Sequence, residues 1–216
     1  MIEHIILSQE ELYDCLLLLD VSKATGPDGI SPRLLKYAAR ELSYPLALLF
    51  NKSLRLGVFP SSWKIANVIP VFKNGEREIV SNYRPISLLS IIGKTMEKCI
   101  FTHLYNYFNR HNVITSLQSG FRPGDSTINQ LLSITDDLGR VLDSGKEVRV
   151  IFCDVSKAFD RVWHEGLLYK LTSYGVRGDL MRWFRSYVSG RTQKVVINGI
   201  SPDAANIGQV FHGVLY

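Results

Sequence analysis

Asp154 stands at the end of an apolar run, where a carboxylate can take part in chemistry. The preceding residues Val148, Val150, Ile151 and Phe152 predict a short buried strand. A buried carboxylate is costly without a partner or a metal. Mg²⁺ takes oxygen ligands from one or two carboxylates and fills its remaining positions with water and substrate phosphates. Asp154 is therefore a candidate Mg²⁺ ligand, although one carboxylate does not complete such a site.

Two cations, Lys73 and Arg84, flank a polar stretch that contains Gly75 and predicts a hairpin. The first strand, residues 66–73, includes Pro70, which favours an edge or a bulge. Lysine supplies a point charge and arginine binds two phosphate oxygens at once, so the pair suits a triphosphate. The alternative is that Lys73 and Arg84 are ordinary surface charges in contact with water.

Capping residues and apolar periodicity predict a helix-rich chain. Ser8 and Ser31 are candidate N-caps, and Asp125 or Ser126 is the candidate cap of a later helix. We expect helices after Ser8 and Ser31, through residues 45–57, 90–110 (the longest), 127–145 and 178–190. A further helical pattern runs from residue 158 to 171, and a strand at 192–197 leads to a turn at 198–199.

Side-chain environments follow from the same periodicity. Helix 127–145 is expected to pack its apolar face against the rest of the protein, and helix 178–190 to have a basic outer side. The residues concerned are Leu131, Leu132, Ile134, Leu138, Val141 and Leu142 for the apolar face, and Arg182, Arg185 and Arg191 for the basic side.

Composition sets the broad class. The chain has 216 residues, 46% of them hydrophobic, enough for one large domain or two small subdomains. Its 25 Lys and Arg against 20 Asp and Glu give a net charge of +5, which favours a polyanionic partner only weakly. Three widely spaced cysteines suggest neither a disulfide framework nor a zinc site. The apolar runs are too short to span a membrane and no signal peptide is evident, so we expect an intracellular protein of the cytoplasm or nucleus, not a secreted one.

Several motifs resemble those of reverse transcriptases from LINE-type, non-LTR retrotransposons, and they occur in that family's order over residues 20 to 200. The motif FCDVSKAFD surrounds Asp154. The other matching blocks are KATGPDGI at 23–30, WK at 63–64 with VIPVFK at 68–73, NYRPIS at 82–87, Lys94 with Glu97, and QSGFR at 118–122 with ST at 126–127. So many blocks in order are specific, whereas any one alone is weak.

The resemblance implies an α/β (α+β) fold with the fingers and part of the palm of a right-hand polymerase. In this interpretation residues 1–145 form a fingers-like region with the first palm helices. Residues 146–216 form a partial palm with the first catalytic motif and a small, mainly antiparallel sheet. The implied reaction is template-directed addition of a deoxynucleotide to a primer 3′ end, with an RNA template, a DNA primer and deoxynucleoside triphosphates as partners.

The resemblance also assigns roles to single residues. Asp154 would hold catalytic Mg²⁺ with the carbonyl of Val155 as a further ligand, and Phe159 would crowd a ribose 2′-hydroxyl. Phe159 could instead be a core residue of its helix, and Asp160 is more simply explained as a charge at a helix N-terminus.

Four residues would contact nucleotide or nucleic acid. By resemblance Lys73 and Arg84 would face the incoming nucleotide, and Arg122 would contact the template. Phe121 could stack on a base, with a buried anchor as its alternative role.

The pattern fails from Gly208 onward, where the family's Pro-Gln-Gly run is replaced by an unrelated sequence. A frameshift or a splicing error in residues 208–216 would explain the change. The Tyr-x-Asp-Asp motif with the remaining palm carboxylates does not occur in the sequence, so the chain alone is expected to be inactive. The alternatives are a non-catalytic nucleic-acid-binding module and a relic reading frame without function.

Overall fold

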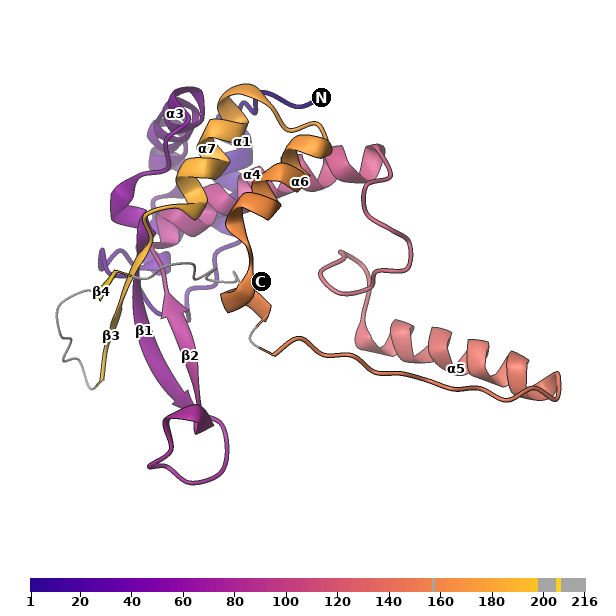
Figure 1. The fold of residues 1–216 in the computed structure, drawn as a ribbon. Helices are drawn as coiled ribbons and strands as arrows, with labels where there is room; N and C mark the ends of the chain where they lie inside the picture. Colours follow the sequence, from indigo (N-terminus) through magenta and orange to yellow (C-terminus); the bar gives the residue numbers. More distant parts are fainter. Residues whose placement is uncertain (157, 198–204, 207–216) are drawn as a thin grey trace. The chain divides into compact units, whose positions relative to one another are not determined.

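The structure, a computed structural model, describes residues 1–156, 158–197 and 205–206. The chain forms two compact units, Met1–Tyr107 with Lys157–Tyr216, and Phe108–Ser156. In the first unit the helices gather at one end of the strands, and β1 and β2 extend away from them to a loop (Figure 1). The predicted boundary between fingers and palm at residue 145 refers to the subdomains of a polymerase, not to these two units, and stays a prediction.

The N-terminal helices begin at the expected caps. The Ser8 hydroxyl accepts the amide of Glu11 at 3.0 Å, and the Ser31 hydroxyl accepts the amide of Leu34 at 3.1 Å. Gly57 ends the third helix with φ of 67°, a left-handed conformation that favours glycine. The helices are α1 (Gln9–Leu17), α2 (Pro32–Tyr37) and α3 (Ala39–Leu56).

The sheet is mixed, with the strand order β2-β1-β3-β4. β1 pairs with β2 antiparallel and with β3 parallel, and β3 pairs with β4 antiparallel. The strands are β1 (Ile65–Phe72), β2 (Tyr83–Leu88), β3 (Thr192–Val195) and β4 (Ala205–Asn206), and the short 3₁₀ helices η1 (Ser61–Lys64) and η2 (Val80–Asn82) precede β1 and β2. The predicted α/β class is confirmed.

Pro70 explains why β1 is paired on both sides over only half its length. β3 pairs with β1 from Ile65 to Val68, and Pro70 lies beyond that stretch, opposite Pro85 of β2. A proline has no amide hydrogen for a second neighbour. The edge prediction is correct for this half of β1, although β1 as a whole is an interior strand.

Aromatic rings form the core where α3 and α7 meet the start of β1. Phe59 is 1% exposed, and its ring lies edge-on to Trp63 at 5.8 Å, Trp183 at 5.4 Å and Tyr187 at 5.1 Å between centroids. The Trp183 indole donates to the Ser53 hydroxyl at 3.1 Å, which satisfies its buried N–H group. This cluster joins residues far apart in the sequence into one unit.

The remaining helices of the first unit agree with the predictions except at one start. α4 (Ile91–Arg110) is the longest described helix, as expected, and its last residues pass into the second unit; α7 (Gly178–Val188) also matches. The pattern from residue 158 forms a 3₁₀ turn, η3 (Ala158–Arg161), and the α-helix α6 begins only at His164 (His164–Ser173). Trp163 caps α6 and lies so close to Gly166 that a Cβ there would be 2.4 Å from the indole.

In the second unit, α5 (Thr127–Asp143) begins at Ser126, whose hydroxyl accepts the Asn129 amide at 3.1 Å. The prediction that this helix packs its apolar face is wrong, because α5 has no buried residue. Leu131, Leu132 and Leu142 are each about 60% exposed (59%, 65% and 59%). The helix forms from its own periodicity and cap, while burial requires a second layer.

The predicted central strand is also wrong. Residues 146–156 do not form a β-strand, and Ile151 and Phe152 are 86% and 89% exposed. A strand is stable only when its backbone groups pair with a neighbour. Among the described residues no strand pairs with this segment, so its β-branched composition alone does not form one.

Two further predictions, the turn at residues 198–199 and the altered tail at 208–216, lie outside the described residues. Among the helices that the structure describes, none combines the length and apolar character needed to cross a bilayer.

Replacement of Phe59 by alanine tests the aromatic core. Phe59→Ala should lower the free energy of unfolding by about 3–5 kcal/mol, because it removes a buried ring between two tryptophans. The matched control is Tyr169→Ala, since Tyr169 is 74% exposed and its loss should change stability by less than about 0.5 kcal/mol. Urea unfolding followed by tryptophan fluorescence measures both. Equal effects of the two substitutions would contradict this core.

Candidate functional site

The β1–β2 hairpin brings Lys73 and Arg84 together. Arg84 lies opposite Val71, and the Lys73 amide donates to the Asn82 carbonyl at 2.9 Å, which continues the ladder past the end of β1. Residues two apart on a strand point to the same face, so Lys73 and Arg84 are diagonal neighbours on one face, at roughly 7–8 Å between their backbones. Both side chains are exposed.

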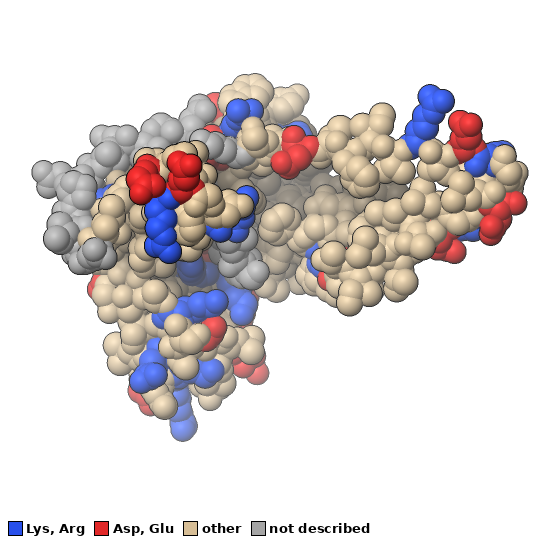
Figure 2. All heavy atoms as spheres, turned by 90° about the horizontal axis from the view of Figure 1, so that it is seen from below, with Lys and Arg blue, Asp and Glu red and all other residues tan. Residues whose placement is uncertain are grey.

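Contacts within the hairpin hold its loop. The Phe72 and Tyr83 rings meet edge-on at 5.5 Å, and the Arg77 guanidinium lies over the Phe72 ring at 4.9 Å. Gly75 has φ of 89°, and a Cβ there would lie 2.6 Å from the Asn82 amide nitrogen. The loop also carries two glutamates, and the view from below shows acidic and basic side chains next to each other (Figure 2).

The predicted template residues lie on a loop of the second unit. Phe121 has φ of 60°, which is uncommon for a bulky side chain, and is 73% exposed. Arg122 donates to the Thr115 carbonyl at 3.2 Å. The Ser119 hydroxyl and the Ser126 amide hold the pKa of the Asp125 carboxyl below its ordinary value by hydrogen bonding. The exposure of Phe121 excludes the buried-anchor role.

Asp154 and Val155 are exposed and belong to the second unit, whereas Phe159, 44% exposed in η3, belongs to the first. Phe159 is thus not among the fully buried residues of the first unit, and its role at a nucleotide stays a prediction. In the part of the chain that the structure describes, no three His, Cys, Asp or Glu side chains come together in a way that could hold a metal ion. Asp136 and Asp137 are paired with Arg140 instead. The described residues therefore do not form a complete Mg²⁺ site.

Comparison with known proteins decides the family. The family model described as reverse transcriptase (RNA-dependent DNA polymerase) matches residues 71–206. The chain belongs to this family. A polymerase from the mobile element jockey of Drosophila melanogaster is 34% identical over 214 residues, 96% of this chain and 23% of that protein. The probable polymerase of the Drosophila melanogaster transposon BS is 34% identical over 163 residues, 75% of this chain and 18% of that protein.

These relatives make the chain a reverse transcriptase segment of the non-LTR retrotransposon type, as its motifs predicted. The segment spans only about a fifth of the length of the relatives it matches. Reverse transcriptases as a family generally depend on a divalent metal.

A buried arginine supports the base of the hairpin in this reverse transcriptase segment. Arg191 is 7% exposed and immediately precedes β3. Its Nε donates to the Tyr187 carbonyl at 2.9 Å, and its guanidinium lies 4.3 Å from the Tyr187 ring and 5.7 Å from the Phe59 ring. The prediction that Arg191 belongs to a basic outer surface is therefore wrong.

Glu97 of α4 faces this guanidinium, with its Oε1 3.8 Å from Nη2 of Arg191. Burial raises the pKa of Glu97, and Arg191, the Tyr187 hydroxyl and Lys94 oppose that rise. Burial also lowers the pKa of Lys64, and the charge of Arg191 adds to this effect. The second carboxylate oxygen of Glu97 and both terminal nitrogens of Arg191 are buried without a hydrogen-bond partner among the described residues.

Sequence reasoning missed this pair as a structural unit. The sequence feature that could have indicated it is the position of Glu97 between Met96 and Ile100, two core residues of 0% and 3% exposure. A glutamate beside inward positions of a long helix indicates a buried partner of opposite charge. The identity of that partner depends on the tertiary structure, since Arg191 lies 94 residues later in the chain.

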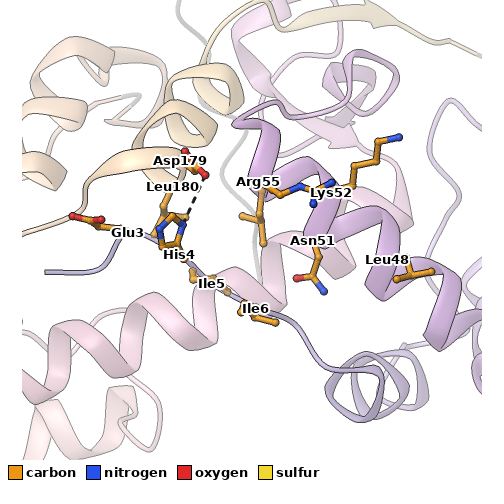
Figure 3. Close-up of a pocket in the computed structure, with 11 residues that line it drawn as sticks. Glu3, His4, Ile5, Ile6, Leu48, Asn51, Lys52, Arg55, Asp179 and Leu180 are labelled. Atoms are coloured by element: carbon orange, nitrogen blue, oxygen red, sulfur yellow. Dashed lines mark ion pairs between the residues drawn. The ribbon is translucent and has the colours of Figure 1, made fainter.

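A pocket of about 420 Å³ lies elsewhere in the first unit, between the N-terminal segment, α3 and the start of α7 (Figure 3). His4 and Asp179 stand at one side of it with 3.8 Å between the imidazole and the carboxylate, and Lys52 and Arg55 of α3 line another. None of the predicted site residues lines it.

The buried glutamate makes stability depend on pH in a defined direction. Because the pKa of Glu97 is raised in the folded state, its favourable contribution is complete below pH 4.5, the ordinary value, and is lost as pH rises through the raised value. Glu97→Gln should therefore become more stable relative to the unmodified chain as pH increases, by at most about 1.4 kcal/mol per pH unit. Urea unfolding of both proteins from acid to neutral pH measures the difference. A difference that shrinks with rising pH would show that attraction to Arg191 outweighs burial.

Proposed function

We propose that this segment forms the fingers and the first palm motif of an RNA-directed DNA polymerase that extends a DNA primer on an RNA template. The observation that carries the proposal is the shared, exposed face of Lys73 and Arg84 on the β1–β2 hairpin of a reverse transcriptase family member. Such a protein would act inside the cell, in the cytoplasm or nucleus, where its nucleic acids and deoxynucleoside triphosphates occur.

Lys73 and Arg84 bind the triphosphate in this proposal. Two cations at diagonal positions of a hairpin can each reach a different phosphate group, the arginine with two parallel hydrogen bonds. The charge of the polyphosphate offsets their mutual repulsion, so the site should bind triphosphates better than monophosphates. Contacts inside the loop keep the two strands in register and thereby keep the cations on one face.

Asp154 and the carbonyl of Val155 remain the candidate ligands for Mg²⁺, and Phe159 the candidate for excluding a ribose 2′-hydroxyl. The ion would neutralise phosphate charge and activate the primer hydroxyl in a complete enzyme. Asp154 and Val155 alone would not complete its coordination shell, and among the described residues no group of three acidic, His or Cys side chains could do so.

Arg122 and Phe121 contact the template in this proposal. The exposed Phe121 ring offers a face on which a base could stack. Arg122 lies next to it on the same loop and can bind the adjoining phosphate.

Triphosphate binding tests the hairpin. Lys73→Ala and Arg84→Ala should each weaken binding of a fluorescent deoxynucleoside triphosphate about tenfold, because each removes a charge-assisted hydrogen bond of about 1.5 kcal/mol or more. Lys170→Ala, which removes an exposed lysine of α6, should leave binding unchanged. Fluorescence anisotropy measures the affinities. Equal affinities of the three variants and the unmodified chain would exclude the hairpin as a triphosphate site.

Primer extension tests the catalytic assignment and separates it from binding alone. The 216-residue chain should not extend a DNA primer on an RNA template, since its sequence contains no Tyr-x-Asp-Asp motif to supply the further carboxylates that two Mg²⁺ ions need. Extension that Asp154→Ala abolishes would contradict this prediction. Salt-sensitive RNA binding that Arg122→Ala weakens and Asp154→Ala leaves intact would favour the non-catalytic binding module.

A further inference from the structure

A second basic surface lies on α2 and α3, away from the hairpin loop. In Figure 1 α3 stands at the helical end of the first unit, opposite the loop between β1 and β2. Residues 32–56 contain five Lys or Arg and one Glu, a net charge of 5 − 1 = +4, whereas the whole chain has only +5. Most of the net charge of the protein is thus concentrated in these 25 residues.

Arginine and tyrosine alternate on the outer side of these helices. Arg33, Tyr37, Arg40 and Tyr44, which we call the Arg–Tyr face, recur at intervals of three and four residues. α2 and α3 are separate helices that meet at Ala38, whose ψ of 20° departs from the helical value, but the buried residues Pro32, Leu35, Ala39 and Ser43 keep intervals of three and four residues across this junction. The four side chains therefore form one row.

The side chains of this row are exposed and available. Tyr37 is 83% and Tyr44 57% exposed, and Arg33 and Arg40 are also exposed. No ion pair with another described residue involves Arg33 or Arg40, whereas Arg140, Arg182 and Arg185 are each paired with an acid of the chain. The nearest acids in sequence are Asp28 and Glu41, and residues 32–56 keep an excess of positive charge because Glu41 is their only acid.

Tyr37 and Tyr44 contribute little to the stability of the fold at their exposed positions. An exposed tyrosine on a helix has lower helical propensity than alanine or leucine and buries little surface. Beside a cation, however, its ring can stack on a nucleobase while the guanidinium binds the adjoining phosphate. Equivalent residues of the row are seven positions apart, about 10.5 Å along a helix, close to the length of three stacked nucleotides at about 3.4 Å each.

A hollow beside Arg40 adds room for a base. It measures about 480 Å³ and is lined by residues of α1 and α3, which are Gln9, Glu10, Tyr13, Arg40 and Ser43. The Gln9 amide donates to the Ser43 hydroxyl at 3.3 Å, so both have polar groups at the hollow. Glu10 would repel a phosphate there and accept a hydrogen bond from a base.

We propose that the Arg–Tyr face binds single-stranded nucleic acid, separately from the polymerase site on the hairpin. Alternating rings and cations favour a single strand, whose bases are free to stack, over a duplex. The same alternation favours a polynucleotide over an acidic peptide, which needs the cations but not the rings. This surface would hold a strand outside the region that takes the triphosphate.

Binding of a short fluorescein-labelled oligouridylate tests the proposal. Tyr37→Ala with Tyr44→Ala should weaken binding at least about tenfold, because stacking on one ring contributes about 1–3 kcal/mol per base. Tyr37→Phe with Tyr44→Phe should retain binding, since phenylalanine keeps the stacking face. Arg33→Ala with Arg40→Ala should lower the slope of log affinity against log salt by about 1.4, for two phosphate contacts on a single strand.

The controls separate this surface from the hairpin and from other partners. In a chain that also carries Lys73→Ala and Arg84→Ala, the Tyr37→Ala and Tyr44→Ala changes should weaken oligouridylate binding by the same factor. The Arg–Tyr face is therefore tested independently of the triphosphate site. All four side chains of the Arg–Tyr face are exposed, and unchanged urea unfolding should confirm that the variants fold. Equal oligouridylate affinity of the Tyr→Ala variant and the unmodified chain would overturn the proposal. So would a stronger affinity for a blunt duplex or for a polyglutamate peptide than for the single strand.

Discussion

The buried guanidinium of Arg191 is the interaction on which the first unit depends. It lies where α4, α7, β1 and β3 meet, and it contacts a carboxylate, a backbone carbonyl and two aromatic rings. A charge at this depth is stable only with these partners, so the helices and the sheet must keep their positions together. Because β3 begins at the next residue, where Thr192 pairs with Ile65, Arg191 lies beside the first residue of β1.

The arginines and lysines of the chain differ in whether an acid among the described residues pairs with them. Arg140, Arg182 and Arg185 neutralise nearby acids, and Arg191 is buried with Glu97. A paired cation has little attraction left for an external anion, whereas an unpaired one at an exposed position can bind it at little cost. The charge that the protein can offer to a ligand is therefore smaller than its basic count suggests. Lys73 and Arg84 of the hairpin and Arg33 and Arg40 of the Arg–Tyr face are exposed cations that form no ion pair with another described residue.

Local signals in the sequence predicted local structure well. The caps at Ser8, Ser31 and Ser126, the end of a helix at Gly57 and the hairpin between β1 and β2 all form as expected, because each depends on residues within a few positions. The predicted strand before Asp154 and the packing of α5 did not form among the described residues. Both need a second layer or a neighbouring strand, and local composition cannot supply either.

The sequence by itself determined the family, the order of the elements and the two cations that share the hairpin face, since motifs and turns are properties of neighbouring residues. Only the tertiary structure decided which charges are buried and which are exposed. Arg191 and Arg33 are alike in sequence terms, yet one stacks inside the core and the other faces solvent. The reason is that burial depends on contacts between distant segments, and the chemistry available to a side chain follows from its burial.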